Sequence, residues 1–208
     1  MSAAEVVEEL RPGLWTWTAP HPAWTPDDGG PEGWKQDVRS YAYVADDVLV
    51  LFDPLSPPEE IIGLAEGRPV SILLTVHWHQ RSAIDLAVGL GATVHAPAEK
   101  IEEVEAPALP YRLGDTLPGG VEPRVGGYPE EATLWLPAHR ALVIGDVFLD
   151  GERGFRVQPD SWIADGLTPA ELRERLRPLL ELPVELLLPT HGDPVEDGRD
   201  VLARVVAA

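Results

Sequence analysis

The sequence contains the same plan twice, and this repeat restricts the fold more than any other feature. Segments 41-YAYVADDVLVLFD-53 and 134-LWLPAHRALVIGD-146 are each 13 residues long, carry polar residues at the centre and end in Asp. Each predicts a β-hairpin, and each is followed by a predicted helix and an apolar strand that ends near a histidine. Two such halves, about 1–105 and 106–208, would pack sheet on sheet with helices outside, which predicts an α/β fold of four layers, αββα.

The remaining elements follow from local patterns. Thr168 and Glu171 form a capping box, which marks the start of a helix. Residues 71–76 are a continuous apolar run, as expected for a strand buried on both faces. We expect strands at 12–19, 71–76, 93–97 and 184–189, and helices at 58–67, 83–91, 169–182 and 194–206.

Composition excludes several classes of protein. The chain has 16 basic and 35 acidic residues and a net charge of −19; because such a surface repels phosphate backbones, we expect no nucleic-acid partner. No apolar run reaches the roughly 18 residues that span a membrane, and the acidic start is unlike a secretory signal, so we expect no membrane partner and a cytoplasmic location. Because cysteine is absent, a transition-metal site would have to use His, Asp or Glu.

Residues 20–38 are rich in Pro, Gly and Asp and predict a long loop. A loop of this length in a compact domain is often a lid over a binding site. Trp24 and Trp34 lie in it and are candidate substrate-binding residues. The alternative is that these two side chains only pin the loop to the core.

Two histidines at the end of the apolar run 71–76 indicate a chelating site. On a strand, residues i and i+2 point to the same side, so His77 and His79 would direct both imidazoles at one point while Trp78 faces away. Asp146 and His191 follow the corresponding strands of the second half. Together these groups indicate a metal or anion site at the strand ends.

These residues, in this order, resemble the metallo-β-lactamase fold superfamily. The matching segments extend over nearly the whole chain, from about residue 12 onwards, and are 52-FDP-54, 75-TVHWH-79, 145-GD-146 and 189-PTHG-192. The resemblance implies a single metallo-β-lactamase-like domain spanning 1–208. It also implies a hydrolase that depends on a bound metal.

The chain departs from the superfamily's metal-binding pattern at three positions. The usual motif is HxHxDH, and its Asp and last His fall on Arg81 and Ser82, giving the degenerate HWHQRS. A further histidine of the superfamily falls on Gly127. We therefore expect a reduced site and no dinuclear centre.

The resemblance leaves enough ligands for one ion. His77, His79 and Asp146 could hold a single divalent metal, Zn first and Fe or Mn as alternatives, with His191 as a fourth ligand. Asp146 would then orient the attacking water, or Asp53 would, and Arg81 would stabilise the developing oxyanion.

Arg81 also allows a different interpretation. Its guanidinium stands where the superfamily has a carboxylate ligand, so it could replace the charge of a missing metal, pair with Asp146 or clamp an anionic group of a ligand. It could equally be a solvent-facing residue that opens the next helix.

Three functions therefore remain open. The first is a mononuclear metal-dependent hydrolase of an ester, thioester or related carbonyl substrate. The second is a pseudoenzyme that binds a small ligand without metal, with Arg81 in place of the metal charge. The third is a mononuclear iron protein, because two imidazoles and one carboxylate also suit oxygen chemistry. Each has a small molecule as its partner, and the sequence does not indicate an oligomeric state.

Overall fold

Two mixed β-sheets form the centre of the protein, in a computed structural model that describes residues 7–151 and 153–207. The first sheet has the strand order β1-β2-β3-β4-β5-β6-β7. Neighbours are antiparallel from β1 to β4 and parallel from β4 to β7. The strands are β1 (Glu8–Arg11), β2 (Leu14–Pro20), β3 (Asp37–Val44), β4 (Leu49–Phe52), β5 (Val70–Leu73), β6 (Thr93–Pro97) and β7 (Ala108–Tyr111).

The second sheet has the order β14-β13-β10-β9-β8. Its strands are β8 (Glu122–Val125), β9 (Ala132–Leu136), β10 (Ala141–Ile144), β13 (Leu186–Pro189) and β14 (Val195–Glu196). The strands β10 and β13 are parallel, and the other pairs are antiparallel. A separate hairpin, β11 (Phe148–Gly151) with β12 (Gly154–Val157), follows β10.

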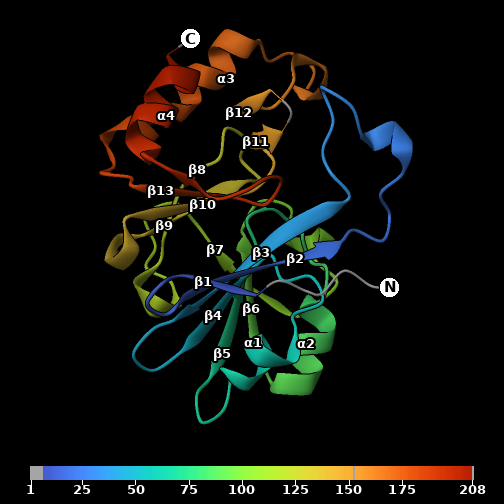
Figure 1. Ribbon diagram of the computed structural model, residues 1–208, viewed down its shortest axis with the longest axis vertical. Helices are drawn as coiled ribbons and strands as arrows, with labels where there is room; N and C mark the ends of the chain where they lie inside the picture. Colours follow the sequence, from blue (N-terminus) through green and yellow to red (C-terminus); the bar gives the residue numbers. More distant parts are fainter. Residues whose placement is uncertain (1–6, 152, 208) are drawn as a thin grey trace.

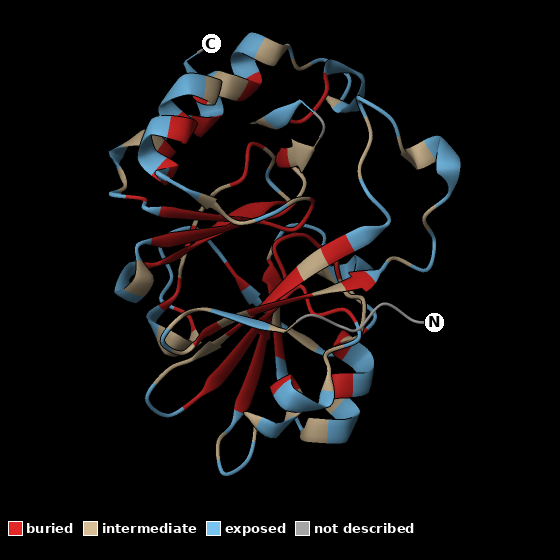
Figure 2. Cartoon of the chain, in the orientation of Figure 1, coloured by how far each residue is buried: buried red, intermediate tan, exposed pale blue. Residues whose placement is uncertain are grey.

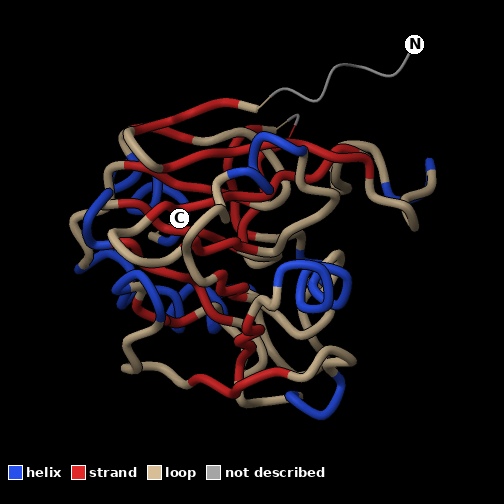
Figure 3. Tube along the Cα trace, turned by 90° about the horizontal axis from the view of Figure 1, so that it is seen from below, coloured by secondary structure: helices blue, strands red, loops and turns tan. Residues whose placement is uncertain are grey.

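Helices cover the outer faces of both sheets (Figure 1). The first sheet carries α1 (Glu59–Gly63) and α2 (Ala83–Leu90), and the second carries α3 (Pro169–Leu176) and α4 (Gly198–Val206). Short 3-10 turns complete the helical segments, at Pro26–Asp28, Ile101–Glu103, Pro118–Gly120, Pro137–His139, Asp160–Trp162 and Arg177–Glu181. Figure 3 shows the same chain turned by 90°, with strands in red and helices in blue.

Three apolar layers hold this sandwich together. Buried residues gather on the strands, and the helices expose their outer faces (Figure 2). Phe52 and Leu188 belong to the layer between the sheets, Ile72 to the layer under α1 and α2, and Leu142 to the layer under α3 and α4. The order of layers is thus αββα, as the repeated sequence plan predicted.

The elements differ from the sequence-based expectations mainly at their ends. The capping box at Thr168 is present, but α3 is regular only to Leu176 and continues as a 3-10 turn. The expected strand 71–76 begins one residue earlier and ends at Leu73. The strands β1, β7, β8 and β14 and the hairpin β11–β12 were not expected, because they are short and lack a clear alternation. Within the described residues, no helix is both long and apolar enough to cross a bilayer.

One buried hydrogen bond joins the two sheets directly. Tyr41 in β3 donates its hydroxyl to the carbonyl of Pro189 at the end of β13, at 2.7 Å. Tyr41 is fully buried, so water cannot replace this donor. The bond therefore fixes the end of β13 against the first sheet, directly before His191.

We expect Tyr41→Phe to lower the free energy of unfolding by about 1–3 kcal/mol, because the buried Pro189 carbonyl loses its donor. Tyr43→Phe is the matched control, since the Tyr43 hydroxyl makes no hydrogen bond within the described part of the chain and the side chain is only partly buried. Urea unfolding of both variants measures the difference. Equal losses in the two variants would show that the bond does not connect the sheets energetically.

Candidate metal centre

Three side chains from distant parts of the chain converge between the sheets. Asp146 Oδ1 lies 3.2 Å from His79 Nε2 and 3.0 Å from His191 Nε2. One ligand atom from each of the three residues lies within 4.8 Å of the others. Both histidines are buried, and Asp146 is partly accessible. Two imidazoles and one carboxylate in this arrangement could hold a single divalent ion.

The sheet topology explains why Asp146 and His191 meet. The strands β10 and β13 are parallel neighbours, and Ile144 pairs with Pro189 at their carboxyl ends. Asp146 and His191 each follow two residues later, so both reach the same edge of the sheet. His79 comes from the other sheet, in the turn after β5. The centre thus lies at the carboxyl ends of strands, where α/β proteins usually bind ligands.

Asp53 fixes the orientation of His79 by contacting its Nδ1, the ring nitrogen that faces away from Asp146. Its carboxylate is buried and accepts hydrogen bonds from the Thr75 backbone N–H at 2.8 Å and from the Thr75 hydroxyl at 2.6 Å. His79 Nδ1 lies 3.0 Å from Asp53 Oδ2. This contact assigns a proton to Nδ1 and leaves Nε2 directed at Asp146, which is the usual arrangement of a carboxylate behind a metal-binding histidine.

The electrostatics of the cluster favour a positive charge at its centre. Burial alone would lower the pKa of His79, but Asp146 and Asp53 raise it to about 9. Burial would raise the pKa of Asp146, but the charge of His79 and the adjacent His191 hold it well below its usual range. Burial lowers the pKa of His191. In the absence of a metal, protonated His79 therefore balances the carboxylates, and a divalent ion could take the place of that proton.

Glu131 supports Asp146, and the sequence analysis did not identify it. It is buried, and its Oε1 accepts hydrogen bonds from the backbone N–H groups of Asp146 and Val147, at 2.8 and 2.9 Å. Burial and the charge of Asp146 raise the pKa of Glu131 to about 8. The close packing of Glu131 appears only in the structure: a Cβ at Gly145 would lie 2.8 Å from Glu131 Oε1 and 2.7 Å from Thr75 Oγ1, so only glycine fits there.

His77 does not join the converging group. The strand β5 ends at Leu73, so His77 and His79 lie in a turn, where the alternation of a strand does not apply. His77 Nε2 instead lies 3.0 Å from Glu103 Oε2. Trp78, which was expected to face away, donates its indole N–H to Asp146 Oδ2 at 2.8 Å. The expectation that His77 and His79 point to one side assumed that both lie on a strand, and this assumption was wrong.

Arg81 lies close to the centre but is directed at the backbone. Its Nη1 donates to the Asp53 carbonyl at 2.8 Å, and among the described residues no ion pair joins it to Asp146. Arg81 has a φ of 44°, in the left-handed region. The charge of Arg81 nevertheless acts on the centre, because it lowers the pKa values of Asp53 and His191. In both cases burial and nearer groups have larger effects on the pKa.

Gly127 and Ser82, the two other departures from the superfamily pattern, have structural roles in this chain. Gly127 has a φ of +89°, and a Cβ there would lie 2.7 Å from Leu172 Cδ1 and 3.1 Å from Val147 Cγ2. A histidine there would adopt a strained positive φ, and the side chains of Leu172 and Val147 would have to shift. The Ser82 hydroxyl accepts a hydrogen bond from the Ser56 backbone N–H at 2.9 Å. Both positions thus serve packing or turn geometry.

The 20–38 loop reaches the centre through its tryptophans. The Trp34 ring lies edge-on to His191, with ring centroids 4.7 Å apart, and Trp24 donates its indole N–H to the Trp34 carbonyl at 3.0 Å. A cavity of about 170 Å³ lies beside them and is lined by both tryptophans, by Leu149 and by His191. His191 Nδ1 has no hydrogen-bond partner within the described residues, so Trp34 restrains its ring.

Known structures match the chain over nearly its whole length. The metallo-β-lactamase FIM-1 from Pseudomonas aeruginosa, in its mono-zinc form, has a TM-score of 0.70 at 11% identity and covers 99% of this chain and 96% of its own. The metallo-β-lactamase family protein TTHA1429 from Thermus thermophilus has a TM-score of 0.62 at 20% identity, with coverages of 96% and 80%. The metal-soaked Flv1 flavodiiron core from Synechocystis sp. PCC6803 has a TM-score of 0.68 at 16% identity, with coverages of 96% and 59%. No protein-family model and no curated protein sequence matches the chain.

The chain therefore has the metallo-β-lactamase fold, as the order of its motifs predicted. The structures with this fold include both β-lactamases and a flavodiiron core. At identities of 11–20% the likeness establishes the fold, and the reaction has to be argued from the residues of the site.

We expect the metal-free protein to lose about 1–3 kcal/mol of stability as the pH rises from 6.5 to about 9. The carboxylates raise the pKa of His79 above its unfolded value of 6.5, so this stabilisation is complete below pH 6.5 and is lost as the pH rises through 9. Urea unfolding of chelator-treated protein across this range measures it. The variant His79→Asn should flatten the slope. A stability that is constant or rises with pH would contradict the assigned pairing.

Proposed function

We propose that the protein is a mononuclear metal-dependent hydrolase of an ester, thioester or related carbonyl substrate. In this proposal His79, Asp146 and His191 bind one divalent ion, with zinc as the first expectation and Fe or Mn as alternatives. This ligand set differs from the one that the sequence suggested, because His191 takes the place of His77.

One observation carries the proposal. Asp146 Oδ1 is buried and lies 3.0–3.2 Å from two imidazole nitrogens, yet no contact to it has the geometry of a hydrogen bond. A buried carboxylate oxygen that makes no hydrogen bond is unfavourable. Because His79 Nε2 also directs its lone pair at this point when Nδ1 carries the proton, a cation between the three atoms would satisfy all of them.

The surrounding residues hold the ligands in place. Trp78 binds Asp146 Oδ2 and Glu131 binds the Asp146 backbone, which leaves Oδ1 free for an ion. Asp53 orients His79, and Arg81 holds the Asp53 carbonyl, so we assign Arg81 a positioning role. When bound, a divalent ion supplies Lewis acidity, which polarises a carbonyl group and assists attack by water near neutral pH.

The cavity beside His191 suggests the kind of substrate. Its volume of about 170 Å³ suits a small acyl group, and Trp24 and Trp34 offer an apolar wall. The net charge of −19 disfavours polyanionic substrates. A small neutral or cationic carbonyl compound is therefore the expected substrate, with the 20–38 loop as its lid.

A specific observation also favours the metal-free alternative. With its pKa raised to about 9, His79 is protonated at neutral pH and lies between Asp53 and Asp146. This charge balances the buried carboxylates without a metal. In that case the protein binds a small ligand beneath Trp34, and His79, rather than Arg81, replaces the charge of the ion.

A pair of histidine variants separates these functions. We expect protein purified without chelator to contain about one equivalent of divalent metal and to hydrolyse small aryl esters. His191→Ala should lower metal affinity and ester hydrolysis at least about 100-fold, because one of three ligands is lost. His77→Ala is the matched control and should retain metal, since His77 contacts Glu103. Elemental analysis and ester hydrolysis, before and after chelation, are the measurements.

Each outcome is informative. Loss of metal in both variants would mean that His77 is a ligand and that the assigned set is wrong. Absence of metal in the unaltered protein after dialysis against excess zinc would contradict the hydrolase proposal and favour the metal-free binder.

A further inference from the structure

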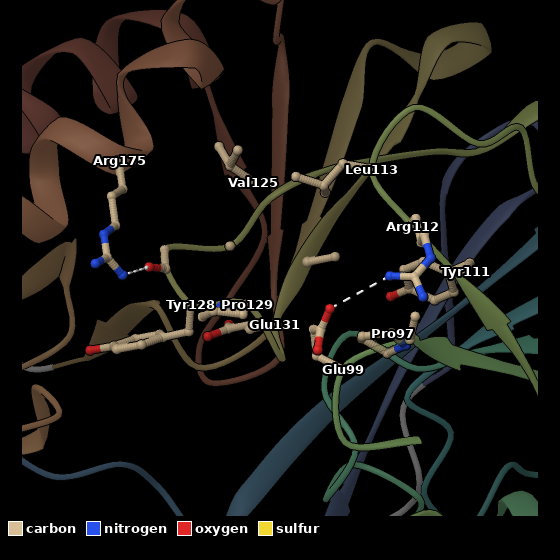
Figure 4. A pocket seen from close by; sticks show the side chains of 14 residues that line it. Pro97, Glu99, Tyr111, Arg112, Leu113, Val125, Tyr128, Pro129, Glu131 and Arg175 are labelled. Carbon is tan, nitrogen blue, oxygen red and sulfur yellow. Dashed lines mark hydrogen bonds and ion pairs between the residues drawn. The ribbon is translucent and has the colours of Figure 1, made fainter. Parts of the chain in front are cut away.

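A cavity larger than the one beside His191 lies between the ends of several strands and α3 (Figure 4). Its volume is about 520 Å³, within the range of small-molecule sites. Its wall comes from the ends of β6 and β7, from the turn between β8 and β9, and from α3. None of the three converging residues lines it. It adjoins the candidate metal centre only through Glu131, which holds the backbone of Asp146.

The wall of this cavity is mostly apolar. Leu113, Val125 and Pro129 line it together with the rings of Tyr111 and Tyr128. The hydroxyl groups of both tyrosines are engaged elsewhere: Tyr111 donates to the Leu74 carbonyl at 2.6 Å, and Tyr128 accepts from Gln158 Nε2 at 2.7 Å. The tyrosines therefore present their rings to the cavity.

One polar group in the wall has an unused atom. Glu131 lines the cavity and is 3% exposed. Its Oε1 is held by two backbone N–H groups, but its Oε2 makes no hydrogen bond within the described residues. Glu131 Oε2 is not among the buried atoms that lack a hydrogen-bond partner, so it is accessible from the cavity. A bound molecule could therefore form a hydrogen bond to it without displacing a contact within the protein.

The charged groups of the cavity already have partners. Arg175 Nη1 donates to the Gly127 carbonyl at 3.1 Å, and Arg112 Nη1 lies 3.5 Å from Glu99 Oε1 (Figure 4). The cavity thus offers no unpaired guanidinium in the described structure for an anionic ligand. This leaves the apolar walls and the Glu131 oxygen as the groups that determine what binds.

We propose that this cavity is a second binding site, for a small apolar molecule that carries one hydroxyl group, with the hydroxyl on Glu131 Oε2. A hydroxyl can both donate to and accept from a carboxyl group, so it fits Glu131 in either protonation state. The ring or chain of the ligand packs against Tyr111, Tyr128 and Val125. The site does not depend on a metal.

Two probes of the same shape test the proposal. The phenol 4-ethylphenol has a hydroxyl where 4-ethyltoluene has a methyl group, so the ratio of their affinities measures the net gain from the hydroxyl in a cavity of fixed shape. In the presence of chelator, we expect the unaltered protein to bind 4-ethylphenol at least roughly tenfold tighter, about 1.4 kcal/mol. Calorimetry or ligand-detected NMR measures both affinities. Equal affinities would overturn the proposal.

Affinities of two variants, together with amide chemical shifts, show whether the probes bind in this cavity. Glu131→Met should reduce the ratio of the two affinities to about one, whereas Glu102→Gln, an exposed residue outside the cavity, should leave it unchanged. Because Glu131→Met removes contacts to the Asp146 backbone and could unfold the chain, amide shifts are also measured on the unaltered protein. Shifts confined to the residues that line the cavity, at 97–99, 111–113, 125–129, 131–132 and 175, support the site. Shifts around His191 instead, or an unchanged ratio in folded Glu131→Met, would contradict it.

Discussion

The buried carboxylate of Asp53 is the interaction on which the rest of the site depends. It follows β4, binds the backbone and hydroxyl of Thr75, and orients His79. Its backbone carbonyl accepts from the Ser40 hydroxyl and from Arg81. Asp53 therefore joins the end of β4 to β3, to the turn after β5 and to the start of α2. Its buried charge is compensated by His79. The imidazole of His79 in turn lies 3.2 Å from Asp146, which the second sheet places beside His191.

The repeat of hairpin, helix and strand was sufficient to predict the fold, because it specifies where each half buries its apolar face. It also identified Asp146 and His191, since residues that follow parallel neighbouring strands must meet. His77 was assigned differently because strand alternation was extended beyond Leu73 into a turn. Glu131 could not be identified, because its role comes from burial against Gly145 and not from any local pattern.

The residues at the positions where the superfamily pattern has further ligands have packing or hydrogen-bonding roles in this chain. Gly127 packs where a side chain would displace Leu172, and Arg81 is held by a carbonyl. Among the described residues, one group of three candidate ligands remains, and its carboxylate Oδ1 lacks a hydrogen bond. Three candidate ligands of this kind suit one ion, as proposed above, and Trp78 and Glu131 hold Asp146 in place.

The most direct test is the position of a bound metal. A crystal of zinc-loaded protein, measured on both sides of the zinc absorption edge, should show one anomalous peak, about 2.0–2.2 Å from His79 Nε2, Asp146 Oδ1 and His191 Nε2. A peak at His77 and Glu103, or no peak at any zinc concentration that leaves the protein folded, would contradict the assignment of these three residues as a mononuclear metal centre.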